Sequence, residues 1–268
     1  RPPRSTAKAS SAASDVYKRQ HINIGNSALI DGSHPASSTY PGSFFLGTTA
    51  PDIRTYTGQD RKDTHFFDLD IFSEQDPIQG LLTKYPGMLN ELNAVTPQSA
   101  FLAGYITHLL ADKRYIEQIY RKFFLTNIDS QFDPSNETQM RYNLFDRTLQ
   151  FELDRIQKSE QSILLNALYK INEQEHIYDI PFIDNVNLND WSKIMMSIVA
   201  QPPVYDRYTH LMHSHLSKLG YTSDKILNHL NDYKKNINDT FNIVSQEYME
   251  QFVNETVKIS LDKIMEFT

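Results

Sequence analysis

The sequence predicts an all-α protein, and three observations lead to this fold class. Apolar residues recur at three- and four-residue spacing over long stretches, and these stretches end at Pro or Gly. No alternating apolar run is long enough to predict a sheet. With 268 residues, of which 40% are hydrophobic and 22% charged, the chain has the composition of a globular protein with a sizeable core. We expect one helical domain over residues 21–268.

Residues 1–20 are set aside as a non-native or disordered tail. They are small, polar and basic, without apolar periodicity, and resemble a translated adaptor sequence. They contain no apolar core of a signal peptide, and no stretch of the chain reaches the roughly 18 apolar residues of a membrane span. The sequence therefore predicts a cytoplasmic protein without a transmembrane segment, and it leaves the oligomeric state open.

The helices are predicted in order along the chain. A short apolar pattern at 21–30 predicts a first helix, and residues 31–64, rich in Gly, Pro, Ser, Thr and Asp, predict a long loop with one turn around Phe44–Leu46. Thr96 and Pro97 are typical of a helix start, and the apolar pattern continues to Phe124. The remaining predicted helices lie at 139–171, 190–200, 203–219, and from Ser223 towards the C-terminus, with an irregular connection at 177–190.

Charge and cysteine content restrict the function. The net charge of −7 does not favour a broad nucleic-acid surface, although one phosphate group beside a metal ion is compatible with it. The chain has no cysteine, so a zinc-type site must use His, Asp and Glu.

The strongest local motif is His108-Leu-Leu-Ala-Asp112 in the predicted helix 96–124. Residues four apart share one helix face, so both side chains could hold one ion. Gly104, one turn earlier, leaves room for another segment. Asp52, after a Pro in the long loop, and His65, beside two Phe residues, complete two imidazoles and two carboxylates. This donor set suits zinc, with iron or manganese as alternatives. A buried polar contact or a helix cap is the simpler interpretation of each residue alone.

The series His21, FFLGTTAPDIR, DTHFF and FLAGYITHLLAD resembles the zinc-dependent phospholipase C family, in particular its bacterial branch, over about residues 21–124. The family is related to the single-strand-specific zinc nucleases. The resemblance implies a helical fold in which Asp52, His65, His108 and Asp112 hold one zinc ion. Asp112 would bridge to a second ion that His21 helps to hold, and Asp52 would be the catalytic carboxylate.

This chain departs from the family pattern in three respects. It has no Trp near its start, no His between His108 and His176, and no H-x3-E motif. One or two metal ions are therefore expected rather than three.

Four further residues are candidates for substrate binding. Arg54 and Arg61 flank Asp52 and His65, and either could bind a phosphate or simply be solvated. His210 and His213 lie three apart on a predicted helix, as metal or substrate ligands or as part of a polar face. Asp146 and Asp154 are possible extra carboxylate ligands, and Trp191 is predicted to be a core residue.

Three functions remain open from the sequence. The first is a phospholipase C-like zinc hydrolase of phosphoric esters, a phosphodiesterase acting on a small phosphoester or phospholipid headgroup through a metal-activated water. A nucleotide hydrolase of the helical His-Asp type would require an adjacent His-Asp dipeptide, which is absent. A metal-stabilised helical binding protein without turnover is the third.

Overall fold

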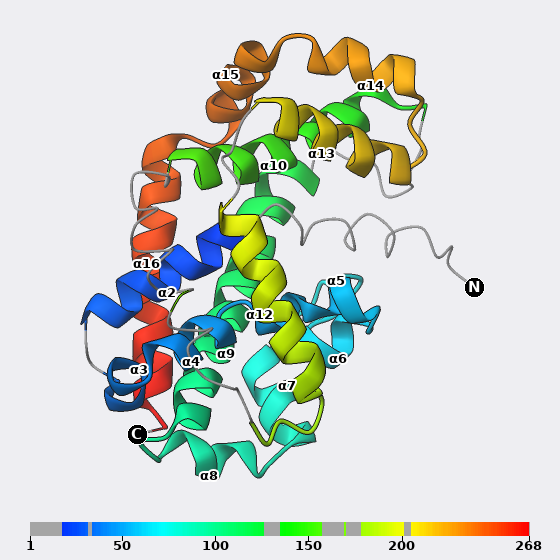
Figure 1. Cartoon of the computed structure of the whole chain (residues 1–268). Coiled ribbons are helices and arrows are strands. Elements are labelled where there is room, and N and C mark those ends of the chain that lie inside the picture. Colours follow the sequence, from blue (N-terminus) through cyan, green and yellow to red (C-terminus); the bar gives the residue numbers. More distant parts are fainter. Residues whose placement is uncertain are drawn as a thin grey trace. The chain divides into compact units, whose positions relative to one another are not determined.

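The computed structural model describes residues 18–31, 34–125, 135–156, 169, 178–200 and 205–267. Every element in these residues is helical and none is a strand, which confirms the all-α prediction (Figure 1). None of the described helices is both long and apolar enough to cross a membrane. The first helix, α2 Lys18–Asp31, begins three residues inside the segment that was set aside.

The chain divides into two compact units, whereas the sequence analysis treated it as one domain. Unit 2 comprises residues 18–113, 159–202 and 252–268, and unit 1 comprises 1–17, 114–158 and 203–251. The core of unit 2 is formed by apolar side chains of α2, α4, α9 and α12, together with the end of α16. The buried Trp191 belongs to this core, as predicted, and its indole N–H donates to Thr49 Oγ1 at 3.2 Å.

The prediction of a long loop over residues 31–64 is wrong. This stretch folds into short helices: α3 Pro35–Thr39, α4 Pro41–Gly47, the 3-10 turn η2 Ala50–Ile53, α5 Arg54–Thr57 and α6 Arg61–His65. The Pro residues that suggested a loop occupy the first turns of α3, α4 and η2, where a missing N–H costs no hydrogen bond. The predicted turn around Phe44–Leu46 lies inside α4. The other helices were missed because each is too short to show an apolar period.

The other helices of unit 2 follow the sequence more closely. They are α7 Pro77–Lys84, α8 Met88–Leu92, α9 Pro97–Arg114, α12 Asn185–Ala200, and the end of α16 Gln246–Met265. Thr96 caps α9 as predicted, because its Oγ1 accepts from the Ser99 N–H at 3.1 Å. The connection before α12 is irregular as expected, but the helix begins at Asn185 rather than 190.

Helix α9 packs against α4 with almost no separation between the backbones. A Cβ atom on Gly104 would stand 2.0 Å from the Phe44 carbonyl oxygen, and one on Gly47 would stand 2.0 Å from the Phe101 carbonyl oxygen. Such reciprocal contact requires glycine on both helices. Gly104 therefore leaves room for another segment, as predicted, and that segment is α4.

Unit 1 contains η3 Tyr115–Phe124, α10 Glu137–Ile156, α13 Tyr205–Lys218, α14 Ser223–Leu230 and α15 Tyr233–Ile243. Helix η3, which is π-helical, continues the pattern predicted to Phe124. The predicted extension of α10 to 171 falls largely outside the described residues. Gly220, with φ +93°, follows α13 as expected.

The prediction of one long C-terminal helix from Ser223 is wrong. The segment consists of α14, α15 and α16, because polar residues begin a new helix at each break. Asp232 accepts from the Lys235 N–H at 2.9 Å, and Ser245 Oγ accepts from the Tyr248 N–H at 3.1 Å.

A buried polar network lies inside unit 1. Tyr115 donates to Asp146 Oδ1 at 2.7 Å, Arg147 donates to Gln150 Oε1 at 2.9 Å, and Arg147 Nε lies 3.4 Å from His215 Nε2. Burial, and then the charges of Arg147 and Lys218, lower the pKa of His215 well below its usual range. His215 is therefore neutral in the folded chain at pH 7.

This neutral histidine should make the protein sensitive to acid. In the unfolded chain His215 gains a proton near pH 6.5, whereas in the folded chain it does so only at much lower pH. Stability should therefore fall as the pH drops below about 6.5, by at most about 1.4 kcal/mol per pH unit from this residue. The His215→Gln variant should show a smaller drop in its urea midpoint between pH 7 and pH 5. Equal drops in both proteins would contradict a neutral, buried His215.

Candidate metal centre

The five predicted ligands come together in unit 2. His21 lies on α2, Asp52 on η2, His65 at the end of α6, and both His108 and Asp112 on α9. Their ligand atoms form two overlapping groups that could hold a metal ion: Asp52, His65 and His108 in one, and His21, His108 and Asp112 in the other. Within each group the atoms lie within 4.8 Å of one another. The folded chain thus brings together residues up to 91 positions apart in sequence.

The histidine tautomers can be assigned from the outer partners of the rings. His108 Nδ1 lies 2.8 Å from the Thr48 carbonyl oxygen, which can only accept, so the proton is on Nδ1. His65 Nδ1 lies 2.9 Å from Thr64 Oγ1, and that hydroxyl in turn donates to the Arg61 carbonyl oxygen at 3.4 Å. We therefore assign the proton of His65 to Nδ1 as well. In both rings Nε2 then carries a lone pair that faces inward.

These inward-facing atoms are all acceptors. The two Nε2 atoms of His65 and His108 lie 3.3 Å apart, and His65 Nε2 lies 3.3 Å from Asp112 Oδ2 and 3.6 Å from Asp52 Oδ1. His108 Nε2 lies 4.0 Å from Asp112 Oδ2. Arg61 donates to Asp112 Oδ2, but the two Nε2 lone pairs and the two carboxylates still converge as acceptors and repel one another. A cation between them would remove that repulsion.

The spacing of the acceptors also fits a tetrahedral ion. Zinc–nitrogen bonds of about 2.0–2.1 Å at tetrahedral angles place neighbouring ligand atoms about 3.3 Å apart. Of the six pairs among the four ligand atoms, two of the four distances given above equal this value, and the other two are 3.6 and 4.0 Å. His65 Nε2 therefore lies at the spacing of neighbouring zinc ligands from both His108 Nε2 and Asp112 Oδ2.

A second ion would have to share Asp112. His108 has one lone pair once Nδ1 is protonated, so it can serve a single ion. The two oxygens of Asp112 face different histidines: Oδ2 lies near His65, and Oδ1 lies 3.4 Å from His21 Nε2. A carboxylate in this position can bridge two ions. The His21 ring stacks on the His108 ring with centroids 3.8 Å apart, which holds His21 beside the first group.

His108 and Asp52 are in the charge states that metal binding needs. His21, Asp52, His65 and His108 are at most 3% exposed, while the Asp112 side chain is 17% exposed. Burial, and then the nearby His21, lower the pKa of His108 to about 3. Burial would raise the pKa of Asp52, but the neighbouring imidazoles of His65 and His108 bring it down to about 2. Neutral imidazole and ionised carboxylate are the metal-binding forms.

Two arginines adjoin the cluster. Arg61 donates from its Nη2 to Asp112 Oδ2 and begins the helix that carries His65. Arg54 directly follows the turn that carries Asp52, and it is half-buried. Burial, and then the Arg61 guanidinium, lower the pKa of Arg54, while Asp52, Asp112 and Asp60 raise it. Within the described part of the chain, the Nε atoms of both arginines are buried and have no hydrogen-bond partner.

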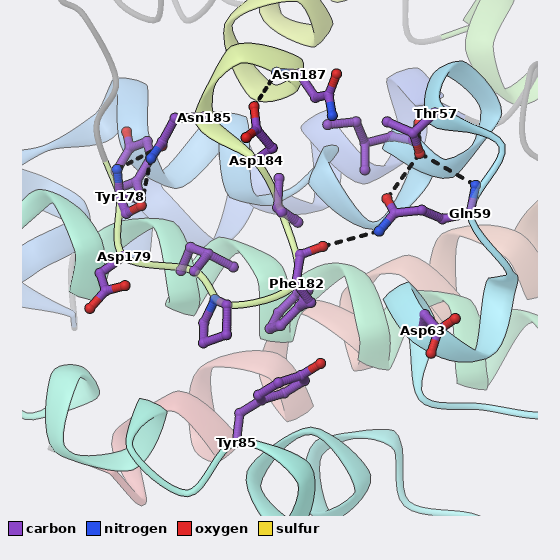
Figure 2. A pocket seen from close by; sticks show the side chains of 14 residues that line it. Thr57, Gln59, Asp63, Tyr85, Tyr178, Asp179, Phe182, Asp184, Asn185 and Asn187 are labelled. Atoms are coloured by element: carbon purple, nitrogen blue, oxygen red, sulfur yellow. Dashed lines mark hydrogen bonds between the residues drawn. The ribbon is translucent and has the colours of Figure 1, made fainter.

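A cavity of about 630 Å³ in unit 2 is lined by none of the five ligands (Figure 2). Carboxylates of Asp63, Asp179 and Asp184 line it, and Gln59 spans it by donating to the Phe182 carbonyl oxygen at 3.1 Å. Three carboxylates disfavour a phosphate there. Two of these have other partners, since Asp63 binds Lys84 at 2.9 Å and Asp184 caps α12.

The remaining candidates lie elsewhere. His210 and His213 are on α13 in unit 1, where His210 is exposed, and their role stays a prediction. Asp146 and Asp154 also belong to unit 1, and Asp146 is engaged in the polar network there.

Sequence reasoning did not identify Thr48 and Thr64, which fix the two histidine tautomers. Thr48 acts through its backbone carbonyl, so no residue type could have revealed it. Thr64 directly precedes His65, so its hydroxyl could have been proposed from the sequence as a hydrogen-bond partner of the imidazole.

Comparison of the chain with protein-family models, with curated proteins and with solved structures finds no match. The family resemblance therefore depends on the motifs themselves, and the functional argument depends on the geometry of the cluster.

Proposed function

We propose that this protein is a metal-dependent hydrolase of phosphoric esters, with zinc as its ion. The observation that carries the proposal is the convergence of four acceptor groups, two imidazoles and two carboxylates, around His65 Nε2, which lies 3.3–3.6 Å from the other three. Two guanidinium groups adjoin the same cluster, and Arg–phosphate pairing is a common mode of phosphate recognition. A phospholipid headgroup is one substrate within this class, in line with the family resemblance.

The residues divide the chemistry between them. A zinc ion held by these residues would supply positive charge to the phosphoryl oxygens and lower the pKa of a water molecule beside it. Asp52, ionised at neutral pH, would orient that water or accept its proton. The Thr48 carbonyl and the Thr64 hydroxyl hold the two imidazoles in their ligating tautomers. Asp112, the most exposed of the five ligands, marks the side from which a substrate can enter.

Elemental analysis and ester hydrolysis together test the proposal. The full chain, stripped of metal and reloaded with zinc, should bind one or two ions per chain and hydrolyse p-nitrophenyl phosphate or bis-p-nitrophenyl phosphate. The His108→Ala/Asp112→Ala double variant should lose the ions and at least about 100-fold of the activity, because it removes two ligands of one ion. His229→Ala, on α14 in unit 1, is the matched control and should retain both.

A metal-stabilised protein without turnover is the second candidate, because four of the ligands are almost fully buried, as in closed structural sites. Zinc binding without hydrolysis of either ester would favour it. Absence of zinc binding would overturn both proposals.

A further inference from the structure

The two arginines beside the cluster are not explained by metal binding. Arg61 begins α6, four residues before His65, so both side chains leave the same helix face. Its guanidinium binds Asp112 through one nitrogen and is only 11% exposed. Arg54 stands two residues after Asp52. The charged groups that act on Arg54 are Arg61 first, then Asp52, Asp112 and Asp60.

This arrangement leaves two guanidinium donors that an anion would satisfy. Two guanidinium groups close enough to repel each other are kept partly out of water, and each leaves a buried Nε–H without an acceptor. Burial of a donor without a partner is unfavourable. Each unpaired Nε–H requires an explanation. An anionic ligand with several oxygens would accept hydrogen bonds from both arginines.

Charge counting indicates which anion fits. The arginines contribute +2, Asp52 and Asp112 contribute −2, and the ligating imidazoles are neutral. One divalent ion therefore leaves the site at +2, and a second would leave it at +4. A phosphate monoester carries close to −2 at neutral pH with three terminal oxygens, whereas a phosphodiester carries −1 with two. Two guanidinium groups and one metal ion make three binding groups. Only a monoester has three terminal oxygens, so only a monoester can offer one oxygen to each group.

We infer that Arg54 and Arg61 form a guanidinium pair that binds the doubly charged terminal phosphoryl group of a phosphate monoester at the His/Asp cluster. This inference rests on the proposed function. In the reaction a water oxygen bonds to phosphorus, and the ester P–O bond breaks with its electron pair on the alcohol oxygen. That oxygen takes one proton of the water, and the other proton remains on the hydrogen phosphate that is released.

The test compares monoester with diester, using activity and binding. In the zinc-loaded wild type, kcat/KM should be at least about 10-fold higher for p-nitrophenyl phosphate than for bis-p-nitrophenyl phosphate. Arg54→Gln should lower the monoester value by about 10- to 100-fold, the worth of a charge-assisted hydrogen bond, and the diester value by less than about 5-fold. Arg54 is the residue to change, because Arg61→Gln also removes a partner of Asp112. Arg141→Gln, on α10 in unit 1 and paired with Asp239, is the matched control.

Calorimetry provides the readout that does not depend on turnover. Inorganic phosphate should bind the zinc-loaded wild type at least about 10-fold more tightly than zinc-loaded Arg54→Gln, with equal zinc content in both. If neither ester is hydrolysed, the proposed function fails, and the phosphate titration still decides the inference. Equal losses on both esters, a wild-type preference for the diester, or equal phosphate affinity in the two proteins would each overturn the guanidinium pair.

Discussion

Alanine in place of Gly104 should destabilise the protein by about 3 kcal/mol, the upper end of the range for overpacking. The new Cβ would stand 2.0 Å from the Phe44 carbonyl oxygen and 2.9 Å from the Thr48 backbone nitrogen. Both are backbone atoms of α4 and its end, so no side-chain rotation can relieve the clash. The two helices must separate, and the packing around them is lost.

The same substitution should weaken metal binding. Gly104 lies one helical turn before His108, and Thr48, whose amide would be displaced, also provides the carbonyl that fixes the His108 tautomer at 2.8 Å. Urea unfolding followed by circular dichroism measures the stability, and zinc titration measures the affinity.

Gly87→Ala is the matched control for this prediction. A Cβ at Gly87 would meet no heavy atom within 4 Å, and its φ of −61° is accessible to alanine. Its stability should change by less than about 1 kcal/mol. A Gly104→Ala variant that unfolds at the wild-type urea concentration would contradict the close approach of α4 and α9.

The sequence predicted those features of the fold that depend on residues within about one helical turn of each other. Thr96 and Pro97 marked the start of α9 because capping and the fixed φ of proline act locally. The short helices between 35 and 65 were missed because they contain only four to seven residues each, and their prolines are equally typical of loops and of first helical turns.

The candidate site divides in the same way. His108 and Asp112 could be paired from their spacing, because the helix fixes it. Their relation to Asp52 and His65 came from resemblance and residue chemistry, since no local rule places α6 beside α9. The tautomers and the position of Arg61 on Asp112 depend on the tertiary structure and could not be read from the sequence.

Zinc should raise the free energy of unfolding by about 4 kcal/mol when its free concentration is 1,000 times its dissociation constant. The Asp52→Asn variant should lose most of this gain, because an amide is a much poorer zinc ligand than a carboxylate. Without metal, the same variant should be as stable as the wild type, or more stable by about 1 kcal/mol. Its amide N–H can donate to the lone pair of His65 Nε2, which lies 3.6 Å from Asp52 Oδ1.

The effect of Asp52→Asn on the metal-free stability distinguishes a metal centre from a buried polar cluster. If His65 carried its proton on Nε2 and donated it to Asp52, the carboxylate would stabilise the metal-free chain and Asp52→Asn would destabilise it. Asp190→Asn is the control, because Asp190 is a half-exposed carboxylate bound to Lys193 and should leave both quantities unchanged. Thermal unfolding of the three proteins, each with excess zinc and with a chelator, measures all the values. A residue such as Asp52 that lowers the stability of the metal-free protein, and raises it when the metal is bound, is typical of residues selected for binding a ligand rather than for the fold.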